Sequence, residues 1–97
     1  MSASDTSKLS SYIGLAQRAN AVLYGEDIIC ERLRLAKVVV IYGGAPEKFK
    51  QRLQNKVKDC CPVFQTEQLR EALHRDNVNA IAVTNDGLAS AIIELLR

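Results

Sequence analysis

The fold is decided by residues 23–37, which read LYGEDIICERLRLAK. A short apolar strand ends at Gly25, and glycine accepts the non-helical backbone that a helix N-cap requires. The two acidic residues that follow suit the positive end of the helix dipole. At 3.6 residues per turn, one helix face is apolar and is expected to pack inward, with Ile29, Leu33 and Ala36 on it and Ile28 beside it. The opposite face points outward and carries Asp27, Glu31 and Arg34.

Outward from this stretch, strands and helices alternate along the chain. Apolar residues recur every three or four positions in the expected helices, whereas residues 38–42 form a continuous β-branched run, typical of a strand buried on both faces. The expected helices cover 7–18, 25–36, 46–60, a short segment capped by Thr66, and a last segment that begins at 85–87; the expected strands are 21–24, 38–42, 62–65 and 79–84. This order predicts an α/β protein, a three-layer α/β/α sandwich with a four-stranded, largely parallel sheet.

Composition and charge limit the class of protein. The 97 residues suit a single domain over 1–97, and 47% hydrophobic with 25% charged residues is typical of a soluble globular protein. The net charge of +2 is too weak a field to imply nucleic acid by itself. No apolar run approaches the ~18 residues of a membrane span, and the polar residues 1–6 lack a signal-peptide pattern and are expected to fray. We therefore expect a cytoplasmic protein without membrane contact.

No group of residues predicts a cofactor, a metal site or catalysis. The three cysteines, two of them adjacent, make a poor disulfide framework and fit a reduced compartment. Cys60, Cys61 and His74 lack the ligand spacing of a zinc site. His74 is the single histidine and has no nucleophile paired with it, and no glycine-rich phosphate-binding fingerprint is present. We expect no enzymatic activity, no cofactor and no small-molecule substrate.

Three stretches of the sequence together resemble a known protein family. Residues 13–20 read IGLAQRAN, residues 24–27 read YGED, and residues 82–87 read AVTNDG. In order and spacing they resemble the LGLAQRAG, SGEE and AVTDxG stretches of small bacterial YlxQ/YbxF-type members of the kink-turn-binding ribosomal-protein family. The resemblance implies an α/β/α sandwich with a mixed four-stranded sheet. It also implies binding to RNA kink-turns, which are sharp bends at an internal loop with tandem sheared G·A pairs.

The family's signature at the opening of the second helix is Gly-x-Asn-Glu-x-x-Lys, and this chain departs from it. Gly25 matches the glycine, whereas Asp27 replaces the asparagine, Ile28 the glutamate and Glu31 the lysine. An ionised aspartate only accepts hydrogen bonds, and isoleucine neither donates nor accepts. A glutamate in place of the lysine exchanges attraction to phosphate for repulsion. Acidic residues recur on or near the expected edge: Glu26, Asp27, Glu31, Glu47, Glu67 and Asp86.

Loops that follow parallel strands gather at one edge of a sheet, where ligands bind. The expected loops are 24–27, 42–44, 65–67 and 85–87, and the loop of any antiparallel strand would leave this set. Gly25 and its acidic neighbours are either a helix cap or a ligand contact. Gly43 and Gly44 form either a tight turn or a place where an RNA backbone comes close. Tyr24 and Tyr42, which close adjacent strands, are either rim residues or stacking platforms for an extruded base.

The helix expected over 46–60 carries the chain's one basic cluster, made of Lys48, Lys50, Arg52, Lys56 and Lys58. Such a cluster is either a solvated helix face or a phosphate contact that ignores RNA shape.

Together with the family resemblance, the residues predict a non-catalytic, ribosome-associated protein that binds structured, kink-turn-like RNA. The alternative is a protein that has lost kink-turn binding and acts as a protein-interaction or self-associating module. The expected RNA-binding residues are Gly25, Glu26, Asp27, Glu31, Arg34, Gly43, Gly44 and Thr66.

Overall fold

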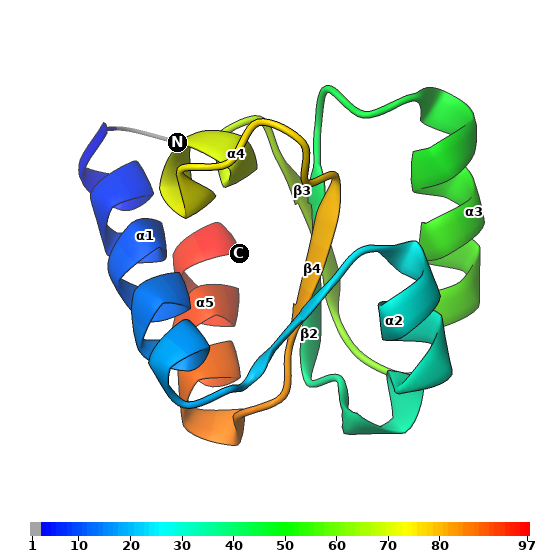
Figure 1. The fold of residues 1–97 in the computed structure, drawn as a ribbon, viewed down its shortest axis with the longest axis horizontal. Helices are drawn as coiled ribbons and strands as arrows, with labels where there is room; N and C mark the ends of the chain where they lie inside the picture. The colour runs from blue at the N-terminus through cyan, green and yellow to red at the C-terminus, as the bar shows by residue number, and fades with distance from the viewer. Residues whose placement is uncertain (1–2) are drawn as a thin grey trace.

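The computed structural model describes residues 3–97, which form a four-stranded sheet between two layers of helices (Figure 1). The elements follow the predicted alternation. In chain order they are α1 (Ala3–Arg18), β1 (Val22–Tyr24), α2 (Glu26–Glu31), the 3₁₀ turn η1 (Leu33–Leu35), β2 (Val38–Tyr42), α3 (Glu47–Val57), β3 (Val63–Thr66), α4 (Leu69–Leu73), β4 (Ala80–Val83) and α5 (Asp86–Leu96).

The sheet is mixed and mostly antiparallel, so the prediction of a largely parallel sheet was wrong. The strand order is β1-β4-β2-β3. Strand β4 lies between β1 and β2 and runs antiparallel to both, whereas β2 and β3 are parallel. Strands β1, β2 and β3 therefore point the same way, and the single reversed strand makes two of the three pairings antiparallel. The mixed sheet agrees with the architecture that the family resemblance implies.

Each face of the sheet covers its own hydrophobic core. Helices α1, α4 and α5 cover one face, and α2 and α3 cover the other (Figure 1). The β-branched strand 38–42 alternates between them: Val38 and Val40 belong to the first core, Val39 and Ile41 to the second. All four side chains are completely buried, which confirms the prediction of a strand covered on both sides.

Two local boundaries differ from the predictions. Helix α1 begins at Ala3, so residues 3–6, expected to be frayed, are helical, and Met1 and Ser2 lie outside the described residues. The helix that follows Gly25 ends at Glu31 and gives way to η1, which turns the chain toward β2. The predicted apolar residues Ile29, Leu33 and Ala36 still pack in the second core, whereas Ile28, expected beside them, is 42% exposed.

No helix among residues 3–97 is long and apolar enough to cross a membrane.

Candidate nucleic-acid interface

The carboxyl ends of β1, β2 and β3 meet at one edge of the sheet, together with the start of β4. Backbone hydrogen bonds join the segments there: the Gly25 amide donates to the Ala80 carbonyl at 3.1 Å, the Tyr42 amide to the Asn79 carbonyl at 2.8 Å, and the Gly43 amide to the Thr66 carbonyl at 2.9 Å. The loop 85–87, predicted at this edge, follows the reversed strand β4 and lies at the opposite edge. It forms the N-terminus of α5, where the Asn85 side chain caps the Leu88 amide.

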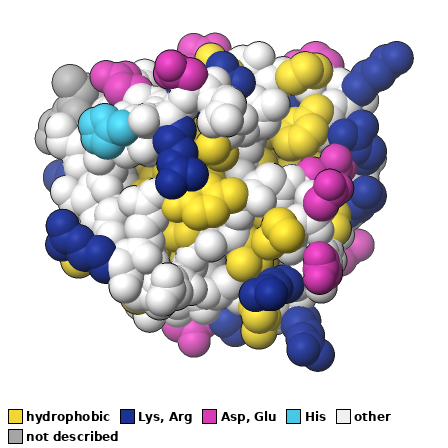
Figure 2. Space-filling view, viewed as in Figure 1, with side chains coloured by type: hydrophobic (Ala, Val, Ile, Leu, Met, Phe, Trp, Pro, Cys, Tyr) yellow, Lys and Arg dark blue, Asp and Glu magenta, His cyan; other side chains and the backbone are white. Residues whose placement is uncertain are grey.

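A hollow of about 350 Å³ opens at this edge. Two aromatic rings, one guanidinium, one carboxylate and two side-chain amides are among the groups that line it. The lining residues are Tyr24, Gly25, Glu26, Phe49, Arg75, Asn77, Val78 and Asn79. The Arg75 guanidinium lies over the Tyr24 ring, 4.8 Å from its centroid. The Tyr24 hydroxyl accepts a 2.7 Å hydrogen bond from Gln17 Nε2, which holds the ring in place. On the face in view, hydrophobic side chains reach the surface, with basic and acidic side chains around them (Figure 2).

Asn79 is held in one orientation at the rim of the hollow. Arg70 donates from Nη2 to Asn79 Oδ1 at 2.7 Å and from Nε to the Val78 carbonyl at 3.3 Å. A guanidinium only donates, so it must face the amide oxygen of Asn79, and the amide nitrogen points away with its two donors. Arg70 itself lies over the Tyr42 ring, 4.2 Å from the centroid. One face of the Tyr42 ring is thus covered by an arginine, as one face of the Tyr24 ring is, but only Tyr24 lines the hollow.

Glu26 is neutralised by α3. Arg52 binds both carboxylate oxygens of Glu26, at 2.6 and 2.8 Å, and Lys56 Nζ lies 3.6 Å from Oε2. The hydrogen bonds from Arg52 lower the pKa of Glu26, although partial burial opposes the shift, and the charges of Arg52 and Lys56 lower it further. The Glu26 side chain is only 17% exposed. It therefore presents much less negative charge to a ligand than the sequence indicates.

The Glu26 ion pairs predict a pH dependence of stability. Folding lowers the pKa of Glu26, so the ionised side chain stabilises the folded state. This stabilisation is complete at a pH above the pKa of an ordinary glutamate, and it is lost as the pH falls through the lowered pKa of the folded protein. Glu26→Gln is expected to be less stable than the wild type near neutral pH, and the difference should vanish in acid. Urea midpoints of both proteins between pH 7 and pH 3 measure this. A difference that stays constant over the range would contradict it.

The turn formed by Gly43 and Gly44 is crowded by the protein itself. A Cβ on Gly44 would lie 2.7 Å from the Tyr42 ring, and one on Gly43 would lie 2.9 Å from Glu67 Cγ. Lys50 Nζ donates to the Gly43 carbonyl at 2.7 Å and lies 3.0 Å from Glu47. Internal packing thus accounts for both glycines, in agreement with the tight-turn interpretation. Lys50 is 7% exposed, so it does not belong to the outer basic face where the pattern placed it.

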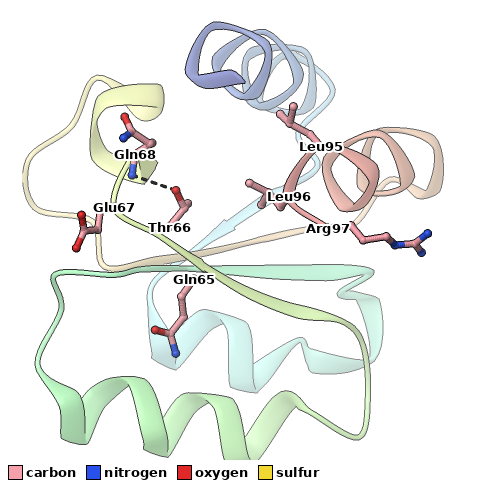
Figure 3. A pocket seen from close by; sticks show the side chains of 7 residues that line it. All are labelled: Gln65, Thr66, Glu67, Gln68, Leu95, Leu96 and Arg97. Atoms are coloured by element: carbon pink, nitrogen blue, oxygen red, sulfur yellow. Dashed lines mark hydrogen bonds between the residues drawn. The ribbon is translucent and has the colours of Figure 1, made fainter. Parts of the chain in front are cut away.

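Thr66 lies in a different hollow and does not cap a helix. It is the last residue of β3, and its hydroxyl accepts a 3.1 Å hydrogen bond from the Gln68 amide (Figure 3). Gln68 is the N-cap of α4 and makes no side-chain cap. This hollow, of about 480 Å³, lies between the start of α4 and the end of α5 and is lined by Gln65, Thr66, Glu67, Gln68, Leu95, Leu96 and Arg97. Figure 3 shows Leu96 pointing into it and Arg97 pointing outward.

The structure brings together only part of the predicted set. Gly25 and Glu26 line the first hollow, and Gly43 lies in the neighbouring loop. Asp27 is exposed beside them in the first turn of α2. Glu31, at the end of α2, and Arg34, in η1, are exposed but follow the chain toward the start of β2, away from the shared edge.

Sequence reasoning missed the residues that shape the hollow from the α4–β4 side. Arg75, Asn77 and Asn79 belong to the polar run RDNVN at 75–79, directly before β4. The run has no periodicity, which is typical of a loop, and loops carry binding residues. The run lies at the shared edge because β4 is antiparallel to its neighbours. The loop before β4 therefore joins the loops that follow β1, β2 and β3.

Comparison with known proteins shows the fold. No protein-family model matches this chain, and no curated protein matches it. A solved protein of unknown function from Bacillus halodurans has a TM-score of 0.82 and 24% identity, covering 93% of this chain and 97% of its own. The Giardia lamblia 15.5kD RNA binding protein has a TM-score of 0.71 and 16% identity, covering 99% of this chain and 88% of its own. At these identities the likeness shows that the chain shares their fold.

Proposed function

We propose that this protein is a non-catalytic RNA-binding protein that binds structured RNA at the edge around Gly25. The observation that carries the proposal is the hollow in which Arg75 and Tyr24 stack beside the oriented amide of Asn79. A neighbour that shares the fold over 99% of this chain is itself an RNA-binding protein. The family resemblance of three sequence stretches points to the same class of partner.

The hollow suits an unpaired base. Aromatic rings and guanidinium planes stack bases that leave a helix, and such bases are read through hydrogen bonds to their edges. Tyr24 and Arg75 supply the stacking surface. Asn79, with its oxygen engaged by Arg70, supplies donors, so a base acceptor is its complement. The ion pairs of Glu26 remove part of the repulsion that a phosphate would meet here.

At the finer level, we propose an RNA with a kinked internal loop, as found in kink-turns, within ribosomal or other ribonucleoprotein RNA in the cytoplasm. Asp27, Ile28 and Glu31 cannot make the side-chain contacts that the family signature implies. In this proposal the stacking pair and the Asn79 amide replace part of those contacts. The RNA would be recognised through an extruded base and the bend that extrudes it.

The test is a titration at moderate salt of this protein against a kink-turn RNA and the same RNA with its G·A pairs replaced by Watson–Crick pairs. A clear preference for the kinked RNA supports the proposal. Equal or absent binding to both would contradict it. That outcome would favour a protein-interaction or self-associating module, for which the exposed Ile28 and Leu35, at 42% and 45%, offer apolar surface.

Glu31→Lys should tighten RNA binding. Glu31 does not line the hollow, so the expected contact is with RNA backbone that extends past the shared edge toward the end of α2. The change removes a negative charge and introduces the cation that the family signature places there, which adds attraction to that backbone. We expect the dissociation constant to fall by about tenfold, roughly 1.4 kcal/mol. The matched control is Glu94→Lys on α5, an exposed glutamate in the other helix layer that does not line the first hollow. An equal gain in both variants would show a general charge effect and no contact at Glu31.

A further inference from the structure

Helix α3 presents a row of cations that begins at the hollow. Residues 48–58 read KFKQRLQNKVK, with five basic residues and no acidic one. Lys48, Arg52 and Lys56 are spaced by four, which places them within one side of the helix at a rise of about 6 Å per step. All three are exposed, and Gln51 and Asn55 between them are exposed as well. From Lys48 onward the outer face of α3 is therefore cationic or uncharged polar, and the one exposed carboxylate of the helix is Glu47, at its first position.

The opposite face of α3 fixes this direction. Leu53 and Val57 are completely buried in the core between the sheet and α3, and Lys50 is turned in toward the Gly43 carbonyl. The helix cannot rotate without removing these contacts. Lys and Arg side chains accordingly stand along the margin of the molecule that α3 forms (Figure 2).

The row is continuous with the candidate interface. Phe49, on α3, lines the hollow, and the Arg52 guanidinium lies 5.7 Å from the Phe49 ring centroid. Glu26, also in the lining, holds Arg52 in a bidentate ion pair and reaches Lys56 at 3.6 Å. These contacts position the two cations beside the hollow. Glu26 compensates one of their charges, and the row of three keeps an excess of positive charge.

We propose that the outer face of α3 binds the phosphate backbone of one stem of the RNA whose unpaired base occupies the hollow. This inference rests on the proposed function and deepens it, since it assigns a second contact surface and the part of the RNA that covers it. The cations of α3 recur at a spacing comparable to that of successive phosphates. They therefore follow one strand of a stem. The contact reads no sequence, because phosphates position a nucleic acid without specifying its bases.

The test compares two double variants by salt-dependent titration against the kinked RNA. Lys48→Gln/Lys56→Gln removes two cations of the row, and glutamine has a helix propensity close to that of lysine. The matched control, Lys8→Gln/Arg18→Gln, removes two exposed cations of α1 in the other helix layer. The α3 variant should bind about fivefold or more weakly at 0.1 M salt, with the slope of log K against log salt reduced by roughly 1.4 to 1.8. The control should retain the wild-type slope.

A second measurement identifies the stem. Each stem of the RNA is shortened in turn. When the stem that contacts α3 is shortened, the α3 variant and the wild type should bind with equal affinity, because the contact is then absent in both. If the wild type prefers kinked RNA but the α3 variant keeps its affinity and slope, the inference is overturned while the proposed function stands. If the wild type shows no preference for kinked RNA, the proposed function fails first, and the inference fails with it.

Discussion

Tyr24→Leu should weaken binding to the kinked RNA by about 5- to 150-fold. Stacking of one base on an aromatic side chain contributes about 1–3 kcal/mol by substitution, and leucine offers no planar ring. The change also removes the partner of the Arg75 guanidinium, which lies 4.8 Å from the ring centroid. Leucine keeps most of the apolar volume that Tyr24 packs against the first core. The expected loss is therefore in binding, with a much smaller loss in stability.

Tyr12→Leu is the matched control for this measurement. Tyr12 is also half-buried against the first core but lies on α1 and does not line the hollow. Both variants are titrated with the kinked RNA at one salt concentration, and their thermal midpoints are compared with that of the wild type. Equal affinities for the two variants would contradict a stacking role for Tyr24, whatever their stabilities.

Leu53→Ala should lower the free energy of unfolding by about 2–5 kcal/mol, the range for a leucine removed from a packed core. Leu53 is completely buried between α3 and the sheet, in the smaller of the two cores. The free energy of unfolding of such domains is about 5–15 kcal/mol, so the change removes a large share of it. The measurement is urea unfolding, with the midpoint shifted and the slope unchanged.

The control for this prediction is Leu15→Ala on α1, where the leucine is 48% exposed and the change should have little effect. A loss at Leu53 no greater than that at Leu15 would mean that α3 does not pack on the sheet through this face. The outward direction of Lys48, Arg52 and Lys56 would then lose its basis, so the stability measurement also checks the geometry behind the proposed phosphate contact.

Local pattern was enough to predict most elements. The β-branched run 38–42 indicated a strand buried on both faces, and the apolar spacing of Leu53 and Val57 indicated the inward face of α3. These predictions succeed because the period of apolar residues reports directly which side of an element leaves water. The pattern failed at Lys50 and Ile28. Lys50 is buried because the Gly43 carbonyl accepts a hydrogen bond from its ammonium group and the Glu47 carboxylate pairs with its charge. Ile28 is exposed although its neighbour Ile29 is completely buried, so the apolar side of α2 is narrower than predicted.

The direction of β4 was decided by the tertiary structure alone. An alternation of strands and helices is typical of parallel sheets, but the order does not specify on which edge, or in which direction, a strand joins. Reversing β4 removes the loop 85–87 from the candidate interface and brings in 75–79 in its place. Of the residues predicted from the sequence, Gly25 and Glu26 line the hollow, whereas the α4–β4 loop that lines it with them was not among the predicted residues.

The charge of the interface likewise depends on contacts between residues far apart in the chain. From the sequence alone, Glu26 is an acidic residue at an edge that would repel phosphate. In the fold it pairs with Arg52, 26 residues away, and with Lys56. Asn79 gains a defined orientation from Arg70, and Arg75 gains a ring from Tyr24. The sequence by itself determined the elements and their buried faces, because those follow from local periodicity. The tertiary structure decided which charges are neutralised and which rings and amides meet, because electrostatic and stacking energies depend on distances that only the folded chain sets.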